Sequence, residues 1–119
     1  MQSPLEIKFL GMASSESVEA AIGRLADRLD HVYTRIQRCI VTVELPHRHH
    51  EHGKQFHVKI VLTVPDAEID VSHDSADPRH EDVYNAISDA FHAARRQLLD
   101  YAQVRRGDVK HKDSNSLPS

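Results

Sequence analysis

The stretch that decides the fold is residues 80–98, HEDVYNAISDAFHAARRQL. Its apolar side chains recur at steps of three or four residues, so they share one face of a helix. Pro78 suits the first turn of this helix, and Arg95 and Arg96 suit its C-terminal half, where cations meet the negative end of the helix dipole. We therefore predict a long amphipathic helix with an apolar stripe made of Val83, Ile87, Ala90, Ala94, Leu98 and Tyr101.

A second helix is predicted near the N-terminus. Ser14 or Ser15 can cap it, and apolar residues then follow at helical spacing from Val18 to Val32. Gly23 lies inside this pattern at a cost of about 1 kcal/mol relative to Ala, which we expect close packing against a neighbour to explain.

The remaining apolar residues alternate with polar ones, as in half-buried strands. They predict strands over residues 5–9, 39–45 and 56–64 and a short strand at 69–71, with a turn at Pro65-Asp66. Short connections favour antiparallel pairing, whereas the first strand needs a helical crossover and should lie parallel to its neighbour. The predicted order is βαβββα. It indicates an α+β fold with one four-stranded mixed sheet and both helices on one face.

The chain length and composition indicate one domain, which we place at residues 1–107. The polar stretch after Gly107, residues 108–119, is expected to be a disordered tail. No apolar run could span a bilayer and no signal peptide is recognisable, so we expect a cytoplasmic protein without a membrane partner. Cys39 is the single cysteine, and it should point inward as a small apolar residue.

The loop HRHHEHGK, residues 47–54, is rich in histidine. Imidazole binds transition metals, but a hairpin loop without Cys or an HExxH motif lacks fixed tetrahedral geometry. A solvated loop is therefore favoured over a metal site, and contact with RNA is a third interpretation. The candidate metal ligands, kept as an alternative, are His47, His49, His50 and His52.

Catalysis finds no support in the sequence. There is no G-x-S-x-G elbow and no Gly-rich phosphate loop. Glu68 and Asp70 are expected on the solvent side of the fourth strand, as ordinary surface charges. We therefore expect no enzyme, no cofactor and no small-molecule substrate.

The distribution of basic residues along the chain gives a clearer indication of function. The net charge is −3, yet Lys and Arg are concentrated in residues 31–64 and 91–119 and acidic residues in 65–90. A local basic face can therefore exist on an acidic protein, and guanidinium groups suit phosphate. The candidate RNA-binding residues are Arg24, Arg28, Arg38, Lys59, Arg95, Arg96, Arg105 and Arg106.

The pattern resembles a known family, the ribosome hibernation-promoting factors and ribosome-associated inhibitors, also called sigma-54 modulation proteins. The resemblance covers about residues 5–106 and is most specific in the last helix. Ala93 departs from it, because the family usually has Lys there. The matching residues of that helix are His80, Glu81, Asp82, Tyr84, Ala86, Ile87, Arg96, Gln97 and Leu98.

The resemblance implies a non-enzymatic translation inhibitor. Members of the family bind the small ribosomal subunit, against its 16S rRNA, where mRNA and tRNA would sit, in stress or stationary phase. The alternative function is a metal-responsive binding module that uses the loop between His47 and His52. The sequence leaves open the oligomeric state, and whether single ribosomes are silenced or paired.

Overall fold

The computed structural model describes residues 4–46, 56–74 and 82–114. The order of elements is the predicted βαβββα. The elements are β1 (Leu5–Leu10), α1 (Glu16–Val32), β2 (Arg38–Glu44), β3 (His57–Val64), β4 (Ala67–Asp74) and α2 (Val83–Ser114).

The four strands form one mixed sheet in the order β1-β2-β3-β4, as predicted. β1 lies parallel to β2, with Leu5 opposite Cys39. The other pairs are antiparallel, and the turn at Pro65 and Asp66 joins β3 directly to β4. The crossover through α1 explains the single parallel pair, because only a long connection returns the chain to the same end of the sheet.

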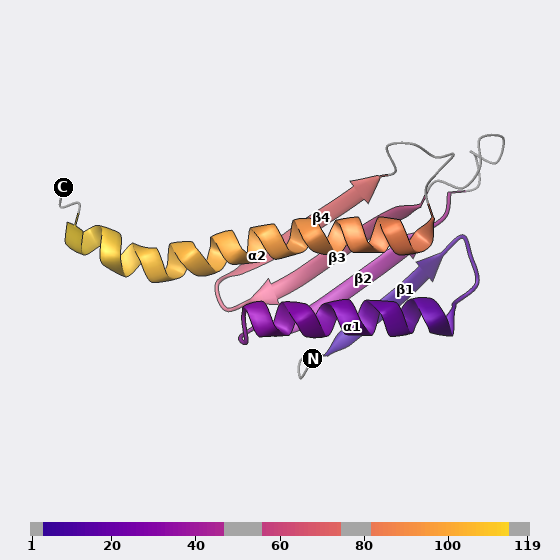
Figure 1. Cartoon of the computed structure of the whole chain (residues 1–119), viewed down its shortest axis with the longest axis horizontal. Coiled ribbons are helices and arrows are strands. Elements are labelled where there is room, and N and C mark those ends of the chain that lie inside the picture. The colour runs from indigo at the N-terminus through magenta and orange to yellow at the C-terminus, as the bar shows by residue number, and fades with distance from the viewer. Residues whose placement is uncertain (1–3, 47–55, 75–81, 115–119) are drawn as a thin grey trace.

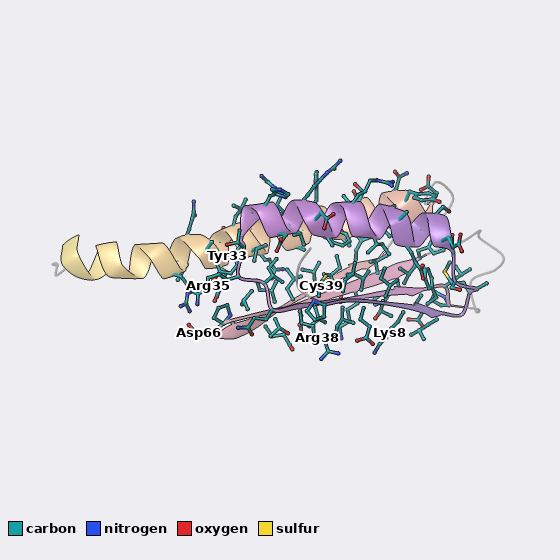
Figure 2. The ribbon with its side chains drawn as sticks, turned by 90° about the horizontal axis from the view of Figure 1, so that it is seen from below. Lys8, Tyr33, Arg35, Arg38, Cys39 and Asp66 are labelled. Atoms are coloured by element: carbon teal, nitrogen blue, oxygen red, sulfur yellow. The ribbon has the colours of Figure 1, made fainter. Side chains whose placement is uncertain are left out.

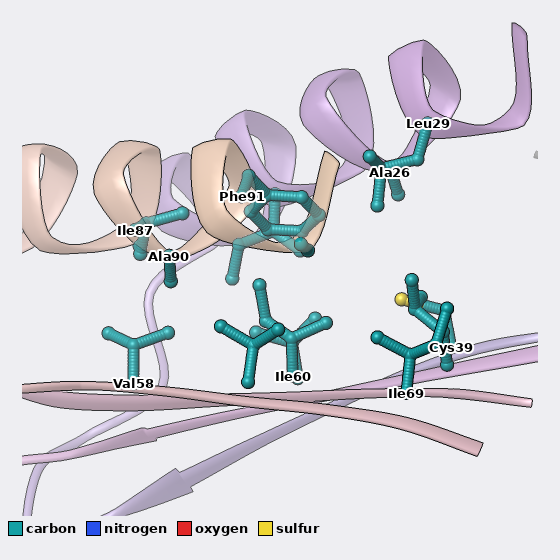
Figure 3. Packing of buried hydrophobic residues seen from close by; sticks show 14 of the residues in the cluster. Ala26, Leu29, Cys39, Val58, Ile60, Ile69, Ile87, Ala90 and Phe91 are labelled. Carbon is teal, nitrogen blue, oxygen red and sulfur yellow. The ribbon is translucent and has the colours of Figure 1, made fainter. Parts of the chain in front are cut away.

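Both helices cover the same face of the sheet, and the other face is open (Figure 1). Strand residues alternate between the two faces, so Cys39 points toward the helices whereas Arg38 points away from them (Figure 2). The core lies between the layers, where Phe91 of α2 packs over strand residues such as Ile60 (Figure 3). Of the apolar stripe predicted from Val18 to Val32, Val18, Ile22 and Leu29 are buried, whereas Leu25 and Val32 are half-buried. Cys39 is buried.

Side-chain caps fix the starts of both helices. The Val18 amide donates to Oγ of Ser15, at 3.3 Å, which confirms one of the two predicted caps of α1. At α2 the Asn85 amide donates to the Asp82 carboxylate, at 2.9 Å, so this helix begins at Val83. Pro78, which we placed in the first turn, lies outside the described residues.

Three sequence expectations need correction. α2 continues past Gly107 to Ser114, because glycine keeps its amide donor and costs a helix far less than proline. The disordered tail therefore does not begin at residue 108, and residues 115–119 lie outside the described part. β4 is longer than predicted, since it pairs with β3 over eight residues. Finally, a Cβ added at Gly23 would meet no atom within 4 Å, so close packing does not explain this glycine.

Candidate nucleic-acid interface

α1 and α2 run side by side in the same direction across the sheet (Figure 1). At their N-terminal ends the hydroxyls of Ser17 and Tyr84 are hydrogen-bonded at 2.9 Å. This arrangement follows from the topology, because each helix runs antiparallel to the strand that precedes it. It brings the C-terminal half of α1, with its arginines, beside the middle of α2.

A groove lies between the two helices, with a volume of about 210 Å³. Its floor is formed by apolar side chains, of which Leu25 is half-buried and Leu29 and Phe91 are only 2% and 3% exposed. Its rim is polar and basic. We call it the interhelix groove, and its lining residues are Leu25, Arg28, Leu29, Ser88, Phe91, His92 and Arg95.

Arg28 and Arg95 come from different helices and line the same groove, and both side chains are exposed. Ion pairs between described residues engage Glu6, Asp66 and Asp89, and none of them reaches either arginine. Two guanidinium groups that pair with no carboxylate of the described residues are suited to a phosphate chain, since each offers a fork of N–H donors to anionic oxygens.

Two further candidates lie on the outer surface of the same helix layer. Arg24 precedes Arg28 by one turn of α1, and Arg96 follows Arg95 on α2. Both are exposed. The structure therefore brings four of the eight candidate RNA-binding residues onto one surface.

Arg38 and Lys59 lie on the opposite, open face of the sheet, where both are exposed (Figure 2 labels Arg38). The Arg38 guanidinium donates to the Glu6 carboxylate at 2.9 Å. This hydrogen bond, with a smaller contribution from Lys8, lowers the pKa of Glu6. The sheet separates these cations from the interhelix groove, so they cannot act with Arg28 and Arg95 as one surface.

Arg105 is engaged within the protein. Its guanidinium forms an ion pair with Asp66 in the β3–β4 turn, and it lies over the Tyr101 ring at 5.6 Å from the centroid. The Arg105 side chain therefore points toward the turn between β3 and β4. The side chain of Arg106 lies outside the described part.

Sequence reasoning missed the other groove residues. Ser88, His92 and Arg95 follow one another at steps of four and three, so a shared face of α2 was readable. Leu25 and Arg28 stand in the same relation on α1. The pairing of these two faces was not readable, because it depends on how the helices pack.

The histidines of the predicted metal alternative, His47, His49, His50 and His52, lie outside the described residues. Within the described ranges, no group of three or more His, Cys, Asp or Glu side chains could hold a metal ion. None of the helices described has the length and apolar character needed to cross a membrane.

Comparison with solved structures shows that other proteins share this fold. A ribosomal subunit interface protein from Coxiella burnetii superposes with a TM-score of 0.68 at 15% identity, over 83% of this chain and 97% of that one. The N-terminal domain of Protein Y from Thermus thermophilus gives a TM-score of 0.63 at 18% identity, over 81% of this chain and 98% of that one. A comparison with curated proteins found no significant match.

The sequence itself matches one family model, described as sigma 54 modulation protein / S30EA ribosomal protein. The match runs over residues 5–106, from the start of β1 to beyond the ion-paired Arg105 of α2. It thus includes the whole sheet and both walls of the interhelix groove. The chain therefore belongs to the sigma 54 modulation protein / S30EA ribosomal protein family.

Proposed function

We propose that this protein binds the small ribosomal subunit through the helix layer and occupies the channel used by mRNA and tRNA. Translation is then inhibited by steric exclusion, in stress or stationary phase, without catalysis or a cofactor. The protein acts in the cytoplasm. The observation that carries the proposal is the convergence of Arg28 and Arg95, from two helices, on one groove.

The family supports a ribosomal partner, and one structural neighbour is described as a ribosomal subunit interface protein. Ribosomal RNA presents phosphates at high density, and a cationic surface that replaces counterions gains much of its affinity from their release. Arg24 and Arg96 extend the cationic surface beyond the groove.

The net charge of −3 does not oppose this interaction. Glu68 and Asp70 are exposed on β4 with their side chains on the open face, away from the helices. The local field at a binding surface depends mainly on nearby charges, because salt screens charges more than about 10 Å away. The sheet thus separates these two carboxylates from the proposed RNA-binding surface.

The test is co-sedimentation with 30S subunits and 70S ribosomes on sucrose gradients at low and moderate salt. We expect the protein to migrate with both at low salt and to dissociate as salt rises. Arg95→Glu should abolish association. Arg38→Glu is the matched control, since it reverses one charge on the opposite face and should leave association unchanged.

Two results contradict the proposal. If the wild-type protein stays at the top of the gradient at every salt concentration, the ribosome is not its partner. If Arg38→Glu weakens association as much as Arg95→Glu, binding is not specific to the helix layer. Arg95→Glu should keep the wild-type melting temperature, because its side chain is exposed. Arg38→Glu should lower it slightly, because the variant loses the ion pair with Glu6 and places two carboxylates side by side.

A further inference from the structure

We infer that the interhelix groove receives one unpaired nucleotide, so that the RNA bound by this protein is a bulge, loop or single strand rather than a continuous duplex. This inference rests on the proposed function and specifies the RNA that the site takes. Phosphate contacts alone would need no apolar surface, yet the floor of this groove is apolar.

The floor is built from apolar side chains that close-packed neighbours hold in place. Leu29 and Phe91 belong to the main core, and Leu25 packs against it from the side. A flat basic surface would suffice to bind the backbone of a duplex. An apolar floor between cationic walls instead matches a nucleotide, which has a flat apolar base and a charged phosphate.

The dimensions of the groove favour a single base. A cavity of about 150 Å³ can hold one benzene ring. The interhelix groove has about 210 Å³, which suits one nucleobase but not a stacked pair. Because Arg28, His92 and Arg95 at the rim are exposed to solvent, a base can enter while its strand continues outside.

The rim supplies the remaining contacts. Arg28 and Arg95 are placed to bind the phosphates on either side of an inserted nucleotide, and guanidinium planes also stack on bases. Ser88 and His92 add polar groups that can hydrogen-bond to the base edge. Bases within a duplex are paired and stacked, so only an unpaired nucleotide can use the floor and the rim together.

The experiment compares two fluorescein-labelled RNA hairpins that differ by one unpaired adenosine in the stem. Fluorescence anisotropy at fixed salt should show that the wild-type protein binds the bulged hairpin at least about fivefold more tightly, the lower end of what one stacked base contributes. Equal affinity for the two hairpins overturns the inference. If the protein still co-sediments with ribosomes, equal affinity for the hairpins contradicts only this inference and leaves the proposed function intact.

A variant that fills the groove tests the location. Ser88→Phe places a ring in the groove without altering its charge, and it should reduce the preference for the bulge to less than about twofold. Gln97→Phe is the matched control, because Gln97 is exposed on the opposite side of α2 and lines another surface hollow. The control should retain the full preference, and loss of preference in both variants would contradict the assignment. Circular dichroism checks that both variants fold.

Competition with free adenosine monophosphate separates a nucleotide within RNA from a soluble ligand. We expect millimolar adenosine monophosphate to displace the bulged hairpin weakly or not at all, because it lacks the second phosphate contact. Complete displacement at micromolar concentration would make the free nucleotide the ligand and overturn the assignment to RNA.

Discussion

Arg105 near the end of the packed part of α2 is paired with Asp66 in the turn between β3 and β4. The two residues are far apart in the sequence, and their ion pair links α2 to the end of the sheet where β3 turns into β4. The Tyr101 ring lies beneath the same guanidinium, and the Tyr33 ring meets Tyr101 edge-on with centroids 5.5 Å apart. Arg105, which the sequence predicts to contact RNA, therefore also has contacts within the protein.

The pair should therefore affect stability more than binding. Its side chains are 35% and 67% exposed, so we expect a coupling of only about 0.5–1 kcal/mol between Arg105→Ala and Asp66→Ala. A double-mutant cycle of urea unfolding measures it. Arg105→Ala should also leave ribosome co-sedimentation close to wild type, and a loss as large as that of Arg95→Glu would restore Arg105 to the RNA-binding surface.

Gly23 offers a stabilising substitution. It lies within α1, and an added Cβ meets open space, so Gly23→Ala should raise the free energy of unfolding by about 0.5–1 kcal/mol. Gly11 is the contrasting control, because its φ of 73° lies in the left-handed region that alanine avoids. Gly11→Ala should lower stability, as measured by thermal unfolding. Equal effects of the two substitutions would show that local backbone geometry does not determine them.

The two groove arginines should act through phosphate. The logarithm of the binding constant falls as the logarithm of the salt concentration rises, with a slope set by the number of phosphates contacted. A protein that contacts two phosphates fewer has a slope smaller in magnitude by about two. We therefore expect Arg28→Ala combined with Arg95→Ala to flatten the salt dependence of RNA binding by about that amount. Anisotropy titrations over a range of salt concentrations provide the slopes. A parallel shift with an unchanged slope would mean that the arginines stabilise the fold or contact bases instead.

The buried thiol of Cys39 should make the free energy of unfolding fall at alkaline pH. Burial of the thiol raises its pKa to about 12, compared with 9.0 for an exposed thiol. Because the pKa is higher in the folded state, this contribution to stability is fully present below pH 9 and is lost between pH 9 and 12. The slope reaches about 1.4 kcal/mol per pH unit at most.

Urea unfolding at a series of pH values measures this dependence. Cys39→Ala is the control, since it removes the titrating group and should reduce the decline above pH 9. The native thiol should also resist alkylation at pH 8 and react once the chain is unfolded. Rapid alkylation of the folded protein would show that Cys39 is accessible.

The fold was predictable because its signals are local. Alternating apolar and polar residues predicted the strands, and apolar residues at steps of three or four predicted the helices. Short connections predicted the antiparallel pairing of strands. The errors arose where a local signal was weak. The stretch after Gly107 was interpreted as a tail because it is polar, yet the helix continues through it to Ser114, since one glycine costs less than the neighbouring turns of helix contribute.

The site was predictable only in part. The candidate arginines of the two helices were named from the sequence, but their convergence depends on the packing of Phe91 against α1. The partner of Arg105 was not readable for the same reason, since Asp66 is brought near only by the tertiary fold. The alternation around Cys39 and Ile60 could have placed Arg38 and Lys59 on the open face, opposite the helices.

The interhelix groove has walls from two segments that only the folded sheet brings together, so the unfolded chain has no such site. Anything that occupies the groove must then bind the native state alone and draw the folding equilibrium toward it. A ligand present at a hundred times its dissociation constant would stabilise the protein by about 2.7 kcal/mol. A chain bound in this way would be harder to unfold, and slower to be degraded, for as long as its partner holds it.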